Sequence, residues 1–156
     1  MTTNILKKQT VRVTKKFTFD MAHALYGYDG PCKNIHGHTY KLSVTLRGKI
    51  YQEELHPKTG MVIDFTDFKK IVRKQVIDVF DHSLVLNSNS PHKTIEGLDE
   101  HFEKLNYVPY QPSCENLLID FINRILPELP NNISMNNMKL EETPTSFAEW
   151  FAEDNM

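Results

Sequence analysis

The chain has 156 residues, 40% of them hydrophobic, which is enough to bury the core of one globular domain spanning residues 1–156. Its 18 basic and 20 acidic residues give a formal net charge of -2, which leaves no cationic excess for binding a nucleic acid. The first eight residues lack the apolar core of a signal peptide, and no later apolar run is long enough to span a bilayer, so we expect a cytoplasmic protein without a membrane partner.

Two alternating runs open the chain and predict a β-hairpin. From residue 11 to 23 the odd positions carry Val, Val, Lys, Phe, Phe, Met and His, so that an apolar face ends in His23. From residue 36 to 46 the even positions carry His, His, Tyr, Leu, Val and Leu, so that this face begins with His36 and His38. In an antiparallel pair the end of the first strand lies beside the start of the second, which brings the three imidazoles together.

Three imidazoles at one end of a buried face favour a shared metal ion. Without a metal, the rings would have unmet hydrogen-bonding nitrogens or would repel one another when protonated. Three histidine nitrogens with one open position are a ligand set of catalytic zinc, so His23, His36 and His38 are the candidate ligands of Zn2+. Each histidine alone would be an ordinary polar residue near a loop, and it is the shared strand face that favours a metal.

The loop between the two strands carries Cys32, four residues before His36. Its thiol could be a fourth zinc ligand, which would close the site into a structural one, or a base or nucleophile whose pKa is lowered by the nearby cation. An inert loop residue is the third possibility, and the spacing does not decide among them. Cys114 is the only other cysteine, and two thiols are too few for a disulfide framework.

A polar connection leads to the first predicted helix. Apolar residues recur at three- and four-residue intervals over residues 65–79, and Asp64 or Thr66 can cap the first turn. The pair formed by Asp81 and His82 follows the end of this helix. It is either an acid–imidazole pair with a chemical role or a histidine kept there because its cation suits the helix dipole.

A polar excursion and a second helix come next. Residues 87–112 are polar and contain prolines, with a short helical turn expected at residues 100–105. Ser113 is a good N-cap for the second helix, which Pro127 should end or distort.

Two strands complete the chain, over residues 133–142 and 145–151. The element order, ββααββ, predicts an α+β fold in which a four-stranded antiparallel sheet carries both helices on one face. Glu142 ends an apolar face of the third strand, where it is either a routine strand-end charge or an acceptor that points into a pocket.

Six short blocks lie in a fixed order along the chain: Phe17–His23, Cys32-x3-His36-Gly37-His38, Gly60–Phe65, Phe80–Leu84, Ser113–Asn116 and Leu140–Thr143. Together, from about residue 11 to 151, the sequence resembles the family of 6-pyruvoyltetrahydropterin synthase and 6-carboxytetrahydropterin synthase. The resemblance implies the tunnelling fold, an antiparallel sheet layered with two helices. It also implies homohexamers, built as dimers of trimeric barrels, with active sites at subunit interfaces.

The resemblance implies catalytic roles that the pattern alone left open. The three histidines would hold zinc, and Cys32 would accept a proton instead of binding the metal. Asp81 and His82 would form the relay that tunes and moves protons. Glu142 would bind the pyrimidine edge of a pterin, because a carboxylate accepts two parallel N–H bonds from such an edge.

A second part of the pterin site is implied at the start of the second helix. There Ser113 and Cys114 would contact the pterin, although the family usually has threonine where Cys114 stands. The implied substrate is 7,8-dihydroneopterin triphosphate. The short Cys-x3-His spacing resembles the bacterial carboxy type, which forms 6-carboxy-5,6,7,8-tetrahydropterin for queuosine synthesis and releases acetaldehyde and triphosphate. The pyruvoyl type, which eliminates triphosphate, commonly has a longer gap.

Two other classes of protein remain open. A cysteine hydrolase that uses Cys32 and His82 would need no metal. A non-catalytic zinc-binding module would use Cys32 as the fourth ligand and would have no turnover.

Overall fold

The computed structural model describes residues 9–156. Residues 1–8, where the sequence predicts no signal peptide, lie outside the described residues. In the described part of the chain, no helix is long and apolar enough to cross a membrane.

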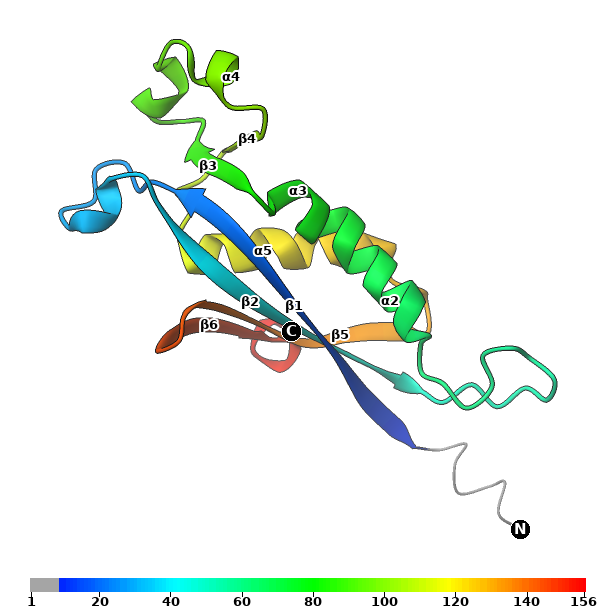
Figure 1. Cartoon of the computed structure of the whole chain (residues 1–156). Coiled ribbons are helices and arrows are strands. Elements are labelled where there is room, and N and C mark those ends of the chain that lie inside the picture. The colour runs from blue at the N-terminus through cyan, green and yellow to red at the C-terminus, as the bar shows by residue number, and fades with distance from the viewer. Residues whose placement is uncertain (1–8) are drawn as a thin grey trace.

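A long antiparallel hairpin forms the centre of the sheet (Figure 1). Strand β1 (Thr10–His23) pairs along its whole length with β2 (His36–Lys49), and the last pair of this register joins His23 to His36. Because side chains alternate between the two faces, the even positions of β2 from 40 to 46 are buried. The predicted hairpin and its buried face are confirmed.

The sheet is larger than predicted and has mixed strand directions. Its order is β4-β3-β1-β2-β5-β6, with β5 (Ile133–Thr143) and β6 (Ser146–Phe151) antiparallel to their neighbours. Strand β3 (Ser83–Asn87) runs parallel to β1, and β4 (Leu105–Val108) runs parallel to β3. The predicted four-stranded antiparallel sheet is therefore wrong. The two additional strands have five and four residues, which is too short for an alternating pattern to stand out.

The first predicted helix is built from three consecutive segments: α2 (Phe65–Val72), the π-helical turn η2 (Arg73–Ile77) and α3 (Asp78–Phe80). Of the two candidate caps, Asp64 is the one used, because its side chain accepts a hydrogen bond from the backbone N–H of Thr66.

Helix α5 (Cys114–Ile125) is the second predicted helix. The Ser113 side chain caps it by accepting from the backbone N–H of Asn116. Pro127 lies in the 3-10 turn η4 (Leu126–Glu128), where the α-helix ends as predicted. The excursion before α5 contains a 3-10 turn, η3 (Pro91–Thr94), and a short helix, α4 (Leu98–His101), which lies slightly before the turn expected at residues 100–105.

Both long helices cover one face of the sheet (Figure 1). The ring of Phe121 on α5 contacts Phe19 of β1 and Phe80 of α3, with centroids 6.1 and 4.9 Å apart. Such aromatic contacts add to the free energy gained by removing apolar surface from water. The helices thereby fix the end of β1 at which the histidines lie.

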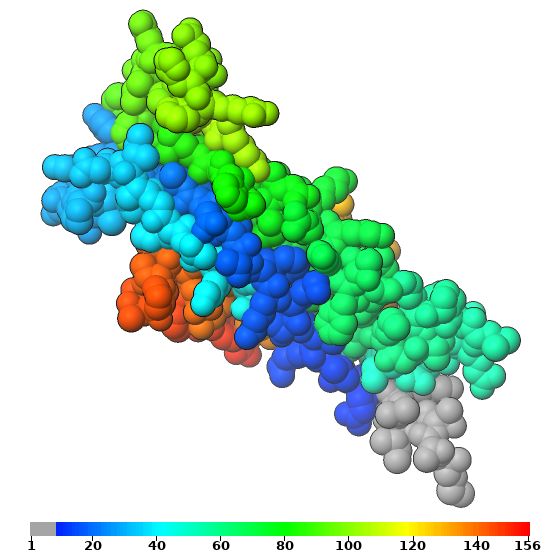
Figure 2. Space-filling model, viewed as in Figure 1, coloured from blue at the N-terminus to red at the C-terminus, as the bar shows by residue number. Residues whose placement is uncertain are grey.

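Two segments gather at the same end of the molecule, beside the end of β1 (Figure 2). One is the loop 24–35, which carries Cys32, and the other comprises residues 88–112. The side chain of Gln111 donates a hydrogen bond of 2.9 Å to the carbonyl of Tyr26, and the Tyr26 ring lies edge-on to His92 at 5.3 Å between centroids. Residues 88–112 therefore hold the loop 24–35, which carries Cys32, in place.

Candidate metal centre and active site

The predicted histidine cluster forms where the hairpin ends. Register places His23 opposite His36 and Met21 opposite His38, so the three rings come from neighbouring positions on one face. The Nε2 atoms of His23 and His36 are 3.0 Å apart, and one ring nitrogen from each of the three histidines lies within 4.8 Å of the others. His23 is 1% exposed, which places the cluster at the inner wall of the site.

Main-chain carbonyls set the tautomers of two of these rings. His23 Nδ1 lies 2.7 Å from the carbonyl of Pro112, and His36 Nδ1 lies 2.8 Å from the carbonyl of Asn34. A carbonyl oxygen only accepts, so each Nδ1 carries the proton and each Nε2 presents a lone pair. This is how ligating imidazoles are oriented in metal sites.

The third ring has a buried nitrogen that needs a partner. His38 Nε2 has no hydrogen-bond partner among the described residues, and the nearest carboxylate oxygen, Glu142 Oε1, is 3.9 Å away. A buried imidazole nitrogen without a partner is costly. A metal ion bound by three Nε2 atoms would satisfy it, so the donor set fits zinc.

Burial favours the neutral form of two of these rings, His23 and His38. Desolvation lowers the pKa of His23 below its ordinary value, against the bond to Pro112 and the charge of Glu142, which raise it. Desolvation lowers the pKa of His38 as well, again against the charge of Glu142. Neutral imidazoles are the form that binds metal, so the site is prepared for a cation at neutral pH.

Cys32 lies in the 3-10 turn η1 (Pro31–Lys33), at the tip of the loop that joins β1 to β2. Its carbonyl accepts a 2.9 Å hydrogen bond from the backbone N–H of Leu25, which closes the loop. The thiol is partly buried. Among residues 9–156, the three histidine nitrogens form a group that could hold a metal. The thiol of Cys32 is not part of this group.

Glu142 lies next to the histidines, at a point where two strands diverge. Pairing between β2 and β5 ends at Lys41 and Glu141, and beyond it a hollow of about 330 Å³ opens, lined by His38 and Glu142 among others. The hydroxyl of Tyr40 donates a 3.2 Å hydrogen bond to Glu142 Oε2. Burial and the charge of Glu142 raise the pKa of Tyr40, so the phenol stays a donor. Of the two alternatives for Glu142, the structure shows the carboxylate in a pocket.

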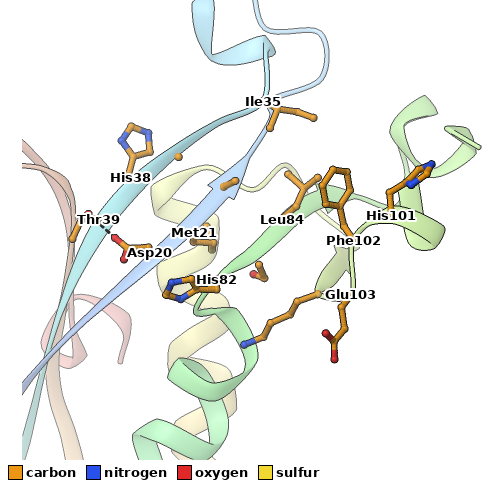
Figure 3. A pocket seen from close by; sticks show the side chains of 14 residues that line it. Asp20, Met21, Ile35, His38, Thr39, His82, Leu84, His101, Phe102 and Glu103 are labelled. Carbon is orange, nitrogen blue, oxygen red and sulfur yellow. Dashed lines mark hydrogen bonds between the residues drawn. The ribbon is translucent and has the colours of Figure 1, made fainter. Parts of the chain in front are cut away.

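Asp81 and His82 contact each other just before β3, with His82 Nδ1 2.9 Å from Asp81 Oδ1. Figure 3 shows the open groove of about 1130 Å³ in which His82 lies, with Asp20 of β1 beside it. Desolvation raises the pKa of Asp81, but the hydrogen bonds from the Asp20 amide and from His82 outweigh it, and the pKa lies below its ordinary value. Asp81 is therefore a carboxylate that can orient an imidazole.

Ser113 and Cys114 have structural partners. Besides its capping bond, Ser113 donates its backbone N–H to the carbonyl of Gln111 at 2.8 Å. The thiol of Cys114 donates to the carbonyl of Leu140 at 3.3 Å. Burial, followed by the charge of Glu142, raises the pKa of Cys114 to about 12, which keeps this thiol protonated.

Three groups that support the site were missed in the sequence. The carbonyls of Pro112 and Asn34 belong to the main chain, so no side-chain pattern could reveal them. Tyr40 shares the even parity of His36 and His38 on β2, and that parity was a signal that could have placed its hydroxyl in the site.

Comparison with known proteins identifies the family. The family model described as 6-pyruvoyl tetrahydropterin synthase matches residues 12–153. The chain belongs to this family. This pterin synthase is 38% identical over 141 residues to the 6-carboxy-5,6,7,8-tetrahydropterin synthase of Haemophilus influenzae, covering 89% of the chain and 97% of the relative.

Two solved structures support the tunnelling fold of this pterin synthase. An uncharacterized protein of Wolinella succinogenes, WS1659, has a TM-score of 0.75 at 18% identity, covering 93% of this chain and 99% of the other. The 6-pyruvoyl tetrahydropterin synthase of Plasmodium vivax has a TM-score of 0.64 at 26% identity, covering 92% and 98%. The α+β tunnelling fold expected from the sequence is confirmed, with the correction to the strands given above.

The double variant His36→Ala, His38→Ala of this pterin synthase is expected to lose its bound zinc. Two of three ligands are removed, and the remaining imidazole of His23 cannot hold the ion alone. Elemental analysis of purified protein measures the zinc per chain, and His101→Ala serves as a control because His101 lines the groove outside the cluster. One zinc per chain in the double variant would rule out the site.

Proposed function

We propose that this pterin synthase is a zinc-dependent carbon–carbon lyase, a 6-carboxytetrahydropterin synthase acting as one domain over residues 1–156. It converts 7,8-dihydroneopterin triphosphate and one water into 6-carboxy-5,6,7,8-tetrahydropterin, acetaldehyde and triphosphate, on the route to queuosine and other 7-deazapurines. The proposal rests above all on the three-histidine cluster, in which His38 Nε2 is buried without a partner among the described residues. The 38% identity to the Haemophilus relative supports the carboxy product.

His23, His36 and His38 would hold the metal through their Nε2 atoms. Zinc bound there would polarise the side-chain hydroxyls of the substrate and make the neighbouring C–H protons removable. Cys32, on the loop between the ligands, takes such a proton as a thiolate, and His82 returns one. The Asp81 carboxylate accepts a hydrogen bond from Nδ1 of His82 and so fixes the orientation of the imidazole. Nε2 of His82 is then free to exchange a proton with the substrate.

Glu142 holds the pterin in this proposal. Its carboxylate lies in the hollow beside His38, so a ring bound there would have its side chain near the metal ligands. A carboxylate matches the two adjacent N–H groups of the pyrimidine edge. Cys114 and Ser113 support the same wall, because the Cys114 thiol is bonded to the strand that carries Glu142.

We also propose that the site is shared between subunits of a homohexamer, a dimer of trimers. His82 lines the large groove, whereas Cys32 lines neither this groove nor the hollow beside Glu142. A relay that serves Cys32 therefore needs a second copy of the chain. The solved neighbours named 6-pyruvoyl tetrahydropterin synthase support the fold on which such assemblies are built.

Mixing one variant without turnover and one with only residual turnover is expected to restore part of the activity. Cys32→Ala supplies an intact relay and His82→Asn supplies an intact thiol, so mixed assemblies contain some complete sites. Asparagine is chosen because His82 has a φ of 58°, which Asn tolerates better than most residues. The variants are mixed after mild dissociation and the rate is compared with that of each alone. A fully active monomer in analytical ultracentrifugation would refute the shared site.

Product analysis tests the proposed reaction. Incubation of the zinc-loaded protein with 7,8-dihydroneopterin triphosphate, followed by mass spectrometry, should reveal 6-carboxy-5,6,7,8-tetrahydropterin and acetaldehyde in equal amounts. Formation of 6-pyruvoyltetrahydropterin with triphosphate alone would assign the pyruvoyl activity. Absence of turnover by zinc-loaded hexamer would favour a non-catalytic zinc module, and full activity after removal of zinc would favour the cysteine hydrolase.

A further inference from the structure

A row of polar groups crosses three strands on the sheet face opposite the histidine cluster. Thr39 of β2 and Asp20 of β1 are register partners, so their side chains lie next to each other. Parallel pairing places Met21 of β1 beside Ser83 of β3, which brings Asp81 and His82 alongside Asp20. Figure 3 shows Asp20 and His82 in the same groove.

The main chain of Asp20 fixes the backbone of the Asp81–His82 pair. Its N–H donates a 3.0 Å hydrogen bond to Asp81 Oδ1, and its carbonyl accepts a 2.6 Å bond from the N–H of His82. His82 is one of two non-glycine residues in the described chain with positive φ, and this bond holds it in that conformation. The relay is thus anchored to β1 and does not depend on α3 alone.

The side chain of Asp20 adds a second carboxylate beside the same imidazole. The hydroxyl of Thr39 donates to Asp20 Oδ1 at 2.6 Å, shown as a dashed line in Figure 3. A carboxylate oxygen of Asp20, one of Asp81 and a ring nitrogen of His82 all lie within 4.8 Å of one another. Two carboxylates on either side of the same ring nitrogen limit the orientations that the imidazole can take.

We infer that Asp20, held by Thr39, is a positioning residue for His82: it orients the imidazole that carries the exchanged proton. This role rests on the proposed function of His82. Asp20 itself need not touch the substrate. Lys104, which also lines the groove, donates a hydrogen bond to the carbonyl of Asp81 and adds a further contact to the pair.

Asp20→Asn tests the charge while keeping the size and an acceptor for Thr39. We expect kcat to fall roughly tenfold, because a proton-transfer group that is less firmly oriented works less efficiently, while KM and zinc content stay unchanged. Glu103→Gln is the matched control, because Glu103 is an exposed carboxylate lining the same groove. An unchanged kcat in Asp20→Asn, or a change in KM alone, would overturn the inference.

A double-mutant cycle separates this role from a general structural one. In a His82→Asn background, Asp20→Asn should not lower the residual kcat further, since the residue on which it acts is gone. The same loss in both backgrounds would show that Asp20 acts elsewhere. Thr39→Ser, which keeps the hydroxyl, should retain the wild-type rate, whereas Thr39→Val should approach Asp20→Asn.

A measurement that does not depend on enzyme activity can show whether this inference or the proposed function has failed. Nuclear magnetic resonance of ring nitrogens should show that Asp20→Asn moves the signals of His82 and leaves those of His101 in place. If the wild-type protein lacks lyase activity but the His82 signals move, the proposed function fails and the coupling of Asp20 to His82 stands. Unmoved His82 signals would overturn the coupling whatever the activity.

Discussion

Cys32→Ala is expected to abolish measurable turnover while leaving one zinc per chain. The three histidine nitrogens come together without the thiol, so the metal keeps its ligands when the thiol is removed. A positioned general base contributes on the order of a hundredfold to ten-thousandfold in rate, and removing it forfeits that contribution. Turnover is measured as acetaldehyde release, and zinc by elemental analysis of the same preparation.

Two controls define the role of the thiol. Cys114→Ala should retain most activity, because that thiol is held protonated and bonded to the carbonyl of Leu140. Cys32→Ser should be nearly as inactive as Cys32→Ala, because a serine hydroxyl is a far weaker acid than a thiol. An unaltered rate in Cys32→Ala would remove the thiol from the mechanism, and loss of zinc would make it a ligand.

Glu142→Gln is expected to lower kcat/KM by on the order of a hundredfold or more, through the loss of a charge-assisted pair of hydrogen bonds in a pocket. The amide of glutamine offers one acceptor where the carboxylate offers two, and its NH2 group would face the donors of the pterin. The hydrogen bond from Tyr40 also loses its charged acceptor. Zinc content should stay unchanged, because the cluster is complete without Glu142.

Pterin affinity is the direct measurement for this residue. Equilibrium binding of a pterin to Glu142→Gln, followed by fluorescence, should be weakened to a similar degree. Glu149→Gln provides the control, because Glu149 is an exposed carboxylate on the neighbouring strand β6. Wild-type affinity in Glu142→Gln would contradict its role as the pterin anchor.

The metal centre could be predicted from the sequence because its ligands lie on an alternating pattern. His23, His36 and His38 share one face of a hairpin, and a hairpin joins residues that are close along the chain. The alternation therefore predicted that the three rings share one face, and the hairpin placed them at one end of it. The capping residues Asp64 and Ser113 were equally accessible, since a cap depends on residues only two or three positions away.

The edge of the sheet could not be predicted in the same way. Strands β3 and β4 pair in parallel with residues far away in the sequence, and neither is long enough to show a period. Strand β3 lies directly after the Asp81–His82 pair. Because the sequence did not predict β3, it also did not predict that this pair lies beside Asp20. That contact depends on strand pairing and not on the spacing of residues along the chain.

Control of the histidine tautomers by main-chain carbonyls has a consequence for how this centre tolerates sequence change. The acceptors at positions 112 and 34 are peptide groups, so any residue that preserves the local backbone supplies the same oxygen. An alanine scan therefore misses the two carbonyl interactions that orient His23 and His36. Substitutions at these two positions are limited by the backbone conformation that they must preserve. The identity of the side chain there therefore does not indicate that the carbonyl orients a metal ligand.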